Sequence, residues 1–462
     1  MRSPMFKRRP MMGWVLAVWL ASPAVQALDL VQTWEQARQH DPQMQVVAAT
    51  RASVQAFELQ AKALWRPVVV GAATVGAMSA DTRMQGAQFS APGFGQSNGV
   101  SFATSANAAT STRWSLQAKQ ALYSPERTAQ QAQLRQAATV AELRSDLAHQ
   151  QFMLLTAQRY FNVLLAERQQ QVLKNQHVAV SRSLAEVKDR FELGDLPVTD
   201  THEAMARAEG LQAQLWVAEN ELQMARKVLA ESARIDPKLL QPLNLRAQAA
   251  WTSLLDWADV QTRVVQGNVG LLLQKARWDV ARQELKKHAL MGAATLDLVA
   301  AAGRDRLSGE GDYGPATNTQ SHQMLGLSLQ IPLYSGGYRS GKLQEAVSAA
   351  DQASAEFDLS LQQTQQQAHA VWLTLRTGPA RLSAVQAALQ ASMARLDATR
   401  LGRQVGDRTT LELLQAENDA AQAELAWLRA HTELLLSRLQ LDALTGDLSV
   451  QSLQSLNAHW RP

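Results

Sequence analysis

The sequence predicts an α+β membrane protein, in which strands of a transmembrane β-barrel continue into a long α-helical coiled-coil barrel. Three observations support this class. Glu126 to Leu193 runs without Pro or Gly, which corresponds to about 100 Å of continuous helix. Segments of about ten residues alternate apolar and polar side chains, as the strands of membrane barrels do. The same succession of landmarks occurs twice, which predicts two tandem structural repeats.

Residues 1–27 have the features of a secretory signal. Four basic residues precede the apolar run MMGWVLAVWLA, and small residues follow it in SPAVQA. The run is too short to span a bilayer, so we expect cleavage after Ala27 rather than a retained anchor. The 462-residue chain has no cysteine, so an exported form must hold together by packing alone. Beyond the signal, the 41 acidic residues are balanced by equally many basic ones, without the basic clusters that nucleic-acid binding requires.

The repeat is visible in short stretches of sequence. RASVQAFELQAKALWRP at 51–67 is similar to RWDVARQELKKHALMGA at 277–293, and LQAKQALYSPE at 116–126 to LSLQIPLYSGG at 327–337. Two polar helix breaks also correspond, RFELGDLPVTDTHEA and RQVGDRTTLELLQAEN. Their matching turn residues are Gly194 with Gly406 and Asp195 with Asp407.

Apolar residues recur every seven positions in the long helices. Leu147, Leu154 and Phe161 show this spacing in the first repeat, and Leu414, Ala421, Leu428 and Leu435 show it in the second. Sustained heptads indicate coiled-coil packing. Helices of this length need partners of equal length beside them.

The expected strands show a different periodicity, in which apolar and polar side chains alternate every second residue. LGLSLQIPLY alternates cleanly, WSLQAKQALY less so, and PVVVGAATVGAM and GAATLDLVAAAG supply two strands rich in small residues. Half-buried strands of a soluble sandwich would give a similar alternation. Trp65, Trp114, Tyr123 and Tyr334 lie at strand ends, where aromatic residues of a membrane interface belong, and this favours a barrel.

These patterns define the expected elements. The first repeat, 28–240, comprises a helix, a strand 67–78, an outer loop 79–111, a strand 112–123, a long helix 126–193, a tip turn 194–198 and a return helix 199–235. The second, 241–462, comprises a helix, a strand 292–302, an outer loop 303–322, a strand 323–334, long helices 342–403, a tip turn 404–409, a return helix 410–444 and a C-terminal tail. Pro379 is expected to kink or split the long helix of the second repeat.

Four strands cannot close a barrel with a usable bore. Symmetric association of several copies can supply the missing strands, and a homotrimer would give a twelve-stranded barrel. Both outer loops are polar and rich in small residues, as expected for segments that face away from the cell.

The chain resembles the TolC family of outer-membrane channel-tunnel proteins over essentially its whole mature length. The segments that carry the resemblance include VQTWEQARQHDPQMQ, ALWRPVV and AQRYFNVLLAE, in addition to both helix breaks and LSLQIPLYSGG. The resemblance implies a homotrimer in outer membrane lipid, with a helical tunnel that crosses the periplasm. It also implies export powered by partners: a periplasmic adaptor (membrane fusion protein) and an inner-membrane transporter of the ABC, RND or MFS type. The missing lipid cysteine favours the general export or type I secretion branch.

The resemblance places both helix breaks at the periplasmic tip, where the tunnel narrows. Asp200 corresponds to a gate aspartate with Thr199 beside it, and Arg408 corresponds to a gate arginine that pairs with that region. Glu412 and Gln415 fall where the family often has two acidic residues around the entrance.

This sequence departs from the family pattern twice. Gln415 carries no charge, so the entrance ring would have one acid per protomer. Arg403 stands where a gate tyrosine is common, so an ionic contact would replace its hydrogen bond to Asp200. Asp200 and Glu412 also suit helix N-termini, where acidic residues act as caps, and both roles can coexist.

The sequence contains only incomplete matches to catalytic motifs. His202-Glu203 begins like a zinc-protease motif but lacks the second histidine, and GEGDYG matches GxGxxG without a helix after it. We therefore expect no enzymatic activity, no cofactor and no metal site. The sequence favours a passive outer-membrane export duct opened at its tip by partner docking. The alternative is a periplasmic coiled-coil adaptor or scaffold without channel activity.

Overall fold

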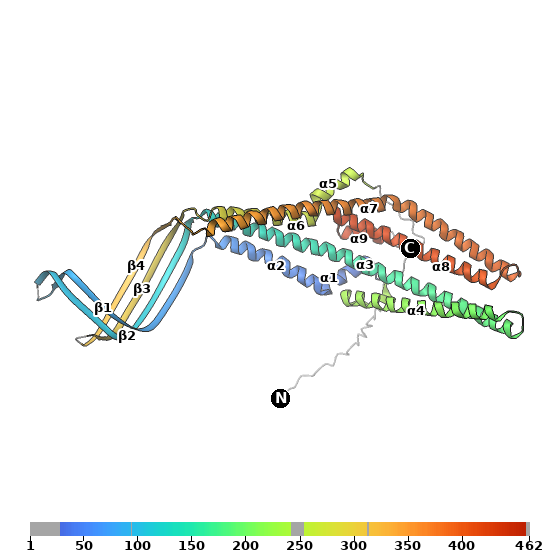
Figure 1. The fold of residues 1–462 in the computed structure, drawn as a ribbon, viewed down its shortest axis with the longest axis horizontal. Coiled ribbons are helices and arrows are strands. Elements are labelled where there is room, and N and C mark those ends of the chain that lie inside the picture. Colours follow the sequence, from blue (N-terminus) through green and yellow to red (C-terminus); the bar gives the residue numbers. More distant parts are fainter. Residues whose placement is uncertain (1–27, 94, 242–253, 312–313, 459–462) are drawn as a thin grey trace, which may run out of the picture.

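Long helices and a β-sheet occupy opposite ends of an elongated molecule in the computed structural model (Figure 1). The structure describes residues 28–93, 95–241, 254–311 and 314–458. The predicted signal sequence lies outside these ranges. Two helical hairpins run side by side away from the sheet, and their tips lie together at the far end (Figure 1).

The described elements follow the chain in an order that places two strands before each helical hairpin. They are α1 (Leu30–His40), α2 (Pro42–Ala63), β1 (Val68–Ala91), β2 (Gly95–Tyr123), α3 (Pro125–Glu192), α4 (Val198–Ala233), η1 (Pro237–Leu239), α5 (Trp257–Gly267), α6 (Val269–Ala289), β3 (Thr295–Gly311), β4 (Gly314–Gln330), α7 (Tyr338–Gln404), α8 (Thr410–Thr445) and α9 (Val450–Ala458). None of the helices in the described ranges is long and apolar enough to cross a membrane.

The strands form a single antiparallel sheet in the order β1-β2-β3-β4. The pairing runs from Val68 opposite Lys119 in the first hairpin to Gly311 opposite Gly314 in the second. Because the order is sequential, β1 and β4 are the edges of the sheet. Each edge presents one row of backbone groups without a ladder partner in a single chain.

The segments 79–111 and 303–322, expected to be outer loops, are mostly strand. β1 continues to Ala91 and β3 to Gly311, so each pair of strands forms a long hairpin. The prediction was wrong because the abundant Gly, Ser and Asn were interpreted as turn formers. In a hairpin each strand satisfies the backbone groups of the other, whatever the side chains are.

The fourth strand ends earlier than expected. β4 stops at Gln330, although the apolar alternation continues through Leu333. Pro332 explains the difference, because proline has no N–H to donate to a ladder. Leu333 and Tyr334 consequently lie 93% and 91% exposed between the sheet and α7.

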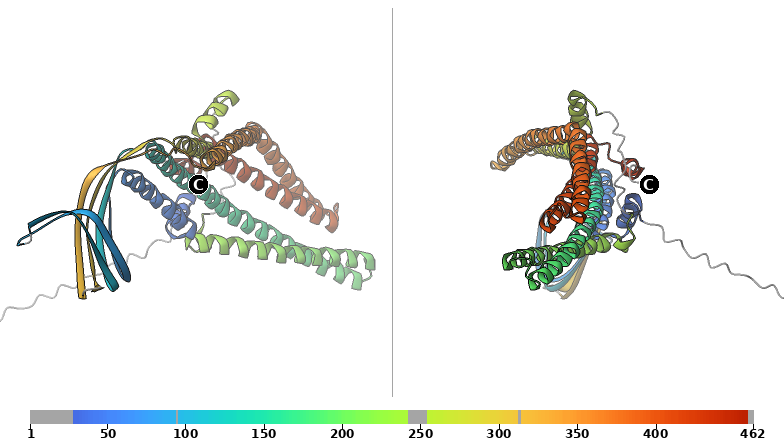
Figure 2. Two further views of the ribbon diagram at one scale, coloured as in Figure 1. Left: turned by 60° about the vertical axis from the view of Figure 1, so that its left-hand side comes forward. Right: turned by 90° about the vertical axis from the view of Figure 1, so that its right-hand side faces the viewer.

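The helix α7 passes through Pro379 without being split. It changes direction partway along its length, as Figures 1 and 2 show. Proline removes the N–H that would bond to the carbonyl of Leu375, and its ring crowds that carbonyl, which are the usual causes of a kink. The neighbouring Gly378 lies against Leu434 of α8 so closely that any Cβ there would displace this side chain.

The main apolar core lies where both helical hairpins meet α1 and α9. Its fully buried side chains include Trp34 of α1, Phe161 of α3, Leu229 of α4, Leu435 of α8 and Leu453 of α9. Apolar burial contributes about 25 cal/mol per Å² removed from water. This core therefore fixes the two hairpins to each other near the middle of the molecule.

A buried polar network reinforces the same region. Ser232 Oγ donates to Asp41 Oδ2 at 2.5 Å, and Arg159 Nη1 donates to Asp41 Oδ2 at 3.2 Å and to Ser232 Oγ at 2.7 Å. Asp41 also accepts from the backbone N–H of Gln43 at 2.8 Å, which caps α2. These partners satisfy the buried carboxylate, so the network ties the junction of α1 and α2 to both α3 and α4.

Packing becomes sparser towards the tips. The buried apolar clusters there are small, formed by Leu173, Leu215 and Ala218 and then by Val180, Ala208 and Leu414. The fold therefore has a firmly packed middle and a less firmly held end.

Leu435→Ala tests the importance of the middle core. Truncating this fully buried side chain removes apolar contacts and leaves a cavity. We therefore expect the free energy of unfolding to fall by about 2–5 kcal/mol. Denaturant unfolding followed by the helical circular-dichroism signal measures the change. Leu193→Ala, at a residue 78% exposed, is the control and is expected to have little effect. Equal stability of the two variants would contradict this description of the core.

Candidate functional site

The two hairpin tips have the same backbone design. Gly194 and Gly406 take positive φ values of 81° and 82°, which glycine adopts at little cost. The amide of Asp195 bonds to the carbonyl of Arg190 at 2.9 Å, and that of Asp407 to the carbonyl of Gly402 at 2.8 Å. Both are Schellman-type helix ends, so the outgoing helices α3 and α7 stop in the same way.

The returning helices begin differently. Thr409 caps α8 in a complete capping box: Glu412 N donates to Thr409 Oγ1 at 3.2 Å, and Thr409 N donates to Glu412 Oε2 at 2.8 Å. The start of α4 follows Pro197 and has no side-chain cap. Asp200 lies in its first turn, where Thr199 Oγ1 donates to it at 3.4 Å. Glu412 therefore acts as a cap, whereas Asp200 remains an exposed carboxylate at a helix N-terminus.

The predicted gate arginines have partners other than Asp200 within this chain. Arg408 Nη1 donates to Glu412 Oε1 at 2.9 Å, one turn along the chain. Arg403 of α7 forms an ion pair with Glu186 of α3. Within one copy of the chain, Arg403 does not contact Asp200, because the arginine side chain reaches sideways to α3 and not to the start of α4.

Three hydrogen bonds to Glu412 shift its titration. They hold the pKa of this carboxyl below its ordinary value of 4.5. The backbone N–H of Thr409 contributes most to this shift, then the Arg408 guanidinium and the Thr409 hydroxyl. The carboxylate therefore stays ionised to lower pH than an isolated glutamate.

Gln415 bridges three helices. Its side-chain oxygen accepts from Arg207 Nη2 of α4 at 3.0 Å, and its Nε2 donates to Asp419 Oδ1 at 3.0 Å. Asp419 in turn accepts from Arg395 of α7 at 2.8 Å. An amide can accept and donate at once, whereas a carboxylate at this position would face Asp419 one turn away as a like charge. This bridge gives the uncharged residue a structural role.

Polar contacts of this kind join the two hairpins along a line that we call the seam. It comprises Arg403 with Glu186, Arg207 with Gln415, Gln176 with Asn418, Arg168 with Glu424, and Arg429 with Gln169. The seam was not among the features predicted from the sequence. Its signal was present, because polar residues also recur every seven positions: Gln169, Gln176 and Ser183 on α3, and Gln415, Gln422 and Arg429 on α8.

Cavities lie along the seam. The one between the tips has a volume of about 650 Å³, and Asp200, Arg403 and Arg408 line it together with Glu186 and Glu203. The structure therefore brings these three predicted gate residues to one cleft.

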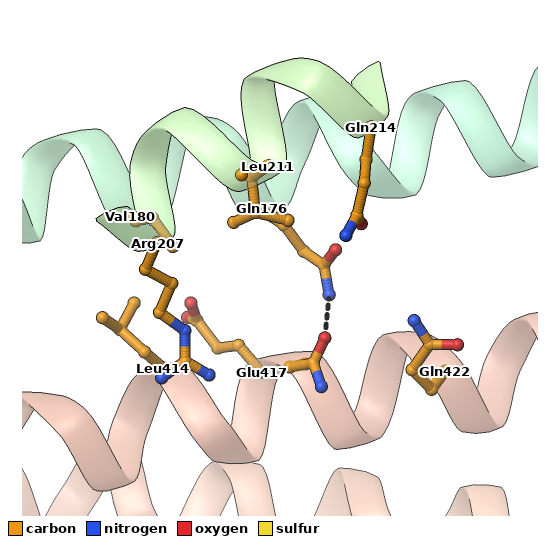
Figure 3. A pocket seen from close by; sticks show the side chains of 10 residues that line it. Gln176, Val180, Arg207, Leu211, Gln214, Leu414, Glu417 and Gln422 are labelled. Atoms are coloured by element: carbon orange, nitrogen blue, oxygen red, sulfur yellow. Dashed lines mark hydrogen bonds between the residues drawn. The ribbon is translucent and has the colours of Figure 1, made fainter. Parts of the chain in front are cut away.

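A second cavity of about 320 Å³ lies further from the tips (Figure 3). Figure 3 shows Arg207 of α4 directed towards α8, with Gln176 and Glu417 on opposite sides of the opening. Gln176 Nε2 donates across it to Asn418 Oδ1 at 3.4 Å. Among the described residues, no group of three or more His, Asp or Glu side chains is placed to hold a metal ion.

The chain is similar in sequence and fold to known proteins. A family model described as outer membrane efflux protein matches residues 294–447. The outer membrane protein TolC of Vibrio cholerae is 27% identical over 453 residues, covering 96% of both chains. The proteases secretion protein PrtF of Dickeya chrysanthemi is 28% identical over 316 residues, or 67% of each chain. The solved structure of the outer membrane protein VceC from Vibrio cholerae superposes with a TM-score of 0.68 at 17% identity, covering 90% of this chain and 96% of that one.

A four-stranded sheet continued by two helical hairpins with paired tips, together with these relatives, defines an outer-membrane export channel. The family model and these relatives indicate an outer membrane efflux channel of the TolC family. The matched proteins named above are membrane, efflux and secretion proteins, and the adaptor alternative gains no support from them.

The capping box makes a prediction about pH. Because the pKa of Glu412 is depressed in the folded protein, the cap and its ion pair are present above pH 4.5 and are lost as pH falls through the folded-state value. Carbon NMR of the carboxyl group, assigned with Glu412→Gln, measures this value. Arg408→Gln is expected to raise it towards 4.5. A wild-type pKa at or above 4.5 would contradict the geometry of the box.

Proposed function

We propose that three copies of the chain form a passive export duct, with a twelve-stranded barrel in the outer membrane. The observation that carries this proposal is the sheet itself. Its exposed side chains include Val69, Leu116, Leu325 and Leu327, between 49% and 76% exposed. Its two edges also lack ladder partners in one chain. Backbone groups within a bilayer must be paired, and closing three sheets edge to edge, β1 to β4, pairs them.

The helices support the same assembly. Within one chain α4 lies against α3, α3 against α8, and α8 against α7, so α4 and α7 are the outer members of an arc (Figure 2). Both carry large exposed apolar side chains, including Trp216 and Met224 on α4, at 59% and 60%, and Met393 and Leu401 on α7, at 54% and 67%. Joining α4 of one copy to α7 of the next covers these residues and closes a helical tunnel.

The order of elements supports two structural repeats. α2, β1, β2, α3 and α4 are followed by α6, β3, β4, α7 and α8 in the same succession. The tunnel extends through the periplasm and meets a periplasmic adaptor and an inner-membrane transporter at its tips. Relatives named as secretion proteins and as TolC support these partners.

The tip cleft is the proposed gate. Asp200 and Thr199 at the start of α4 are exposed and available to Arg408 of a neighbouring copy, while Arg403 and Glu186 hold the two hairpins of one copy together. Such exposed pairs contribute about 1 kcal/mol or less each, so a docking partner can displace them. Glu412 supplies the charge of the entrance ring, partly compensated by Arg408, and Gln415 supplies none.

Membrane fractionation together with single-channel recording tests the proposed function. We expect the protein in the outer-membrane fraction and a conductance in planar bilayers. A soluble protein without conductance would refute the proposal.

Removing the links at the gate is expected to increase leakage. Glu186→Gln, Arg403→Gln, Asp200→Asn and Arg408→Gln should each raise the ratio of open to closed channels up to roughly fivefold, because each removes one exposed contact. Resting conductance in bilayers measures the effect. Arg51→Gln, which breaks an ion pair between α2 and α3, is the control and should leave conductance unchanged. Unaltered conductance in the four gate variants would exclude these residues from gating.

The entrance ring makes a prediction about ion selectivity. Glu412→Gln removes its charge and should lower the preference for cations, whereas Arg408→Gln frees the same carboxylate and should raise that preference. The reversal potential in a salt gradient reports both shifts. Glu231→Gln, an exposed residue near the end of α4, is the control. Identical reversal potentials in all variants would mean that Glu412 serves only as a cap.

A further inference from the structure

The pairing of the strands separates the side chains of the sheet into two faces. Residues directly opposite one another in an antiparallel ladder project to the same side. Leu298 pairs with Leu327 and Ala300 with Leu325, so even-numbered positions of β3 share a face with the exposed leucines of β4. We call this the apolar face; Asp297 and Asp305 project from the other.

The apolar face ends in basic residues. After Ala302, the next side chains of β3 on this face are Arg304 and Arg306, both exposed. Arg304 pairs with Trp114 of β2, which is 49% exposed, and Arg306 pairs with Thr112. An aromatic residue beside two arginines is typical of the boundary between the apolar interior of a bilayer and its headgroups.

The spacing along the strand agrees with this boundary. Arg306 lies ten residues beyond Leu296, which is roughly 33 Å along a strand and about 25 Å across a membrane for strands tilted by about 40°. That is about the height of the apolar band of an outer-membrane barrel. The arginines lie on the hairpin-turn side of this band, away from the helices.

The two arginines differ from the basic residues of the opposite face in their partners. There, Arg113 bonds to Asp305 at 2.7 Å and Lys119 to Asp297 at 2.9 Å. For Arg304 and Arg306, the described part of the chain supplies no carboxylate within ion-pair distance. Glu310, on the same face, is four residues beyond Arg306, or about 13 Å along the strand. The apolar face thus presents two guanidinium groups without a counter-ion from the described chain.

We propose that Arg304 and Arg306, with Trp114 beside them, bind a phosphorylated lipid headgroup of the outer leaflet. The guanidinium group offers paired N–H donors that match phosphate oxygens, and successive residues on one strand face are about 7 Å apart, within reach of a single headgroup. The ring of Trp114 supplies an apolar contact at the level where the acyl chains begin. This inference rests on the proposed placement of the sheet in the outer membrane.

Full-length protein in phosphatidylcholine nanodiscs provides the test. Lipid A with its phosphates, lipid A without phosphates and inorganic phosphate are added in separate arms, and bound lipid is counted by native mass spectrometry. We expect saturable binding of phosphorylated lipid A alone. Arg304→Ser/Arg306→Ser should weaken it at least about tenfold, and Arg304→Lys/Arg306→Lys should weaken it less, because charge remains without the paired donors.

Matched controls keep the outcomes distinct. Lys174→Ser/Lys275→Ser removes the same charge from exposed positions of α3 and α6 and should leave binding unchanged. Unchanged binding in the double arginine variant, equal binding of lipid A without phosphates, or saturation of the site by inorganic phosphate would overturn the inference. Failure of the wild type to insert and conduct would instead refute the proposed function.

Discussion

Backbone hydrogen bonding at the edges of β1 and β4 is the constraint on which the proposed assembly depends. A sheet of four strands cannot curl far enough to join its own edges, and a bilayer offers no water to replace the missing partners. The strands also determine where the helices begin, because Tyr123 ends β2 and Pro125 begins α3, with a single residue between them. In the proposed assembly, the circumference of the barrel therefore determines how many helices surround the tunnel axis.

The chemistry of packing changes along the molecule. Near the middle, Trp34, Phe161 and Leu435 form an apolar core that includes both hairpins, and the network around Asp41 supplies partners to its buried carboxylate. Towards the tips, hydrogen bonds and ion pairs between long side chains take over. This gradient concentrates rigidity where α1 and α9 cross the bundle and leaves the far end held by individually weak contacts.

Periodicity made much of the architecture accessible from the sequence. The heptads, the alternation in LGLSLQIPLY and the turns at Gly194 and Gly406 are local signals, and each has a direct physical reading. The extent of the hairpins was not accessible, because polar composition does not distinguish a loop from a strand whose backbone is already paired. The partner of Arg403 also depends on which neighbouring helix its side chain reaches. That geometry is three-dimensional, and no spacing in the sequence encodes it.

The bridging role of Gln415 shows the same limit. Its departure from the family pattern was visible, but its explanation required the positions of Arg207 and Asp419 on two helices. By contrast, the polar heptads of α3 and α8 are local signals in the sequence, but apolar periodicity alone does not reveal them.

The polar character of the seam has a thermodynamic consequence. When two surfaces joined by amides, guanidinium groups and carboxylates part, water takes the place of each lost partner, and little apolar area becomes wet. The heat-capacity change of such a separation is correspondingly small, so its enthalpy and entropy vary little with temperature. If the proposed gate opens along the seam, each opening exposes little of the apolar surface that makes partly opened proteins aggregate.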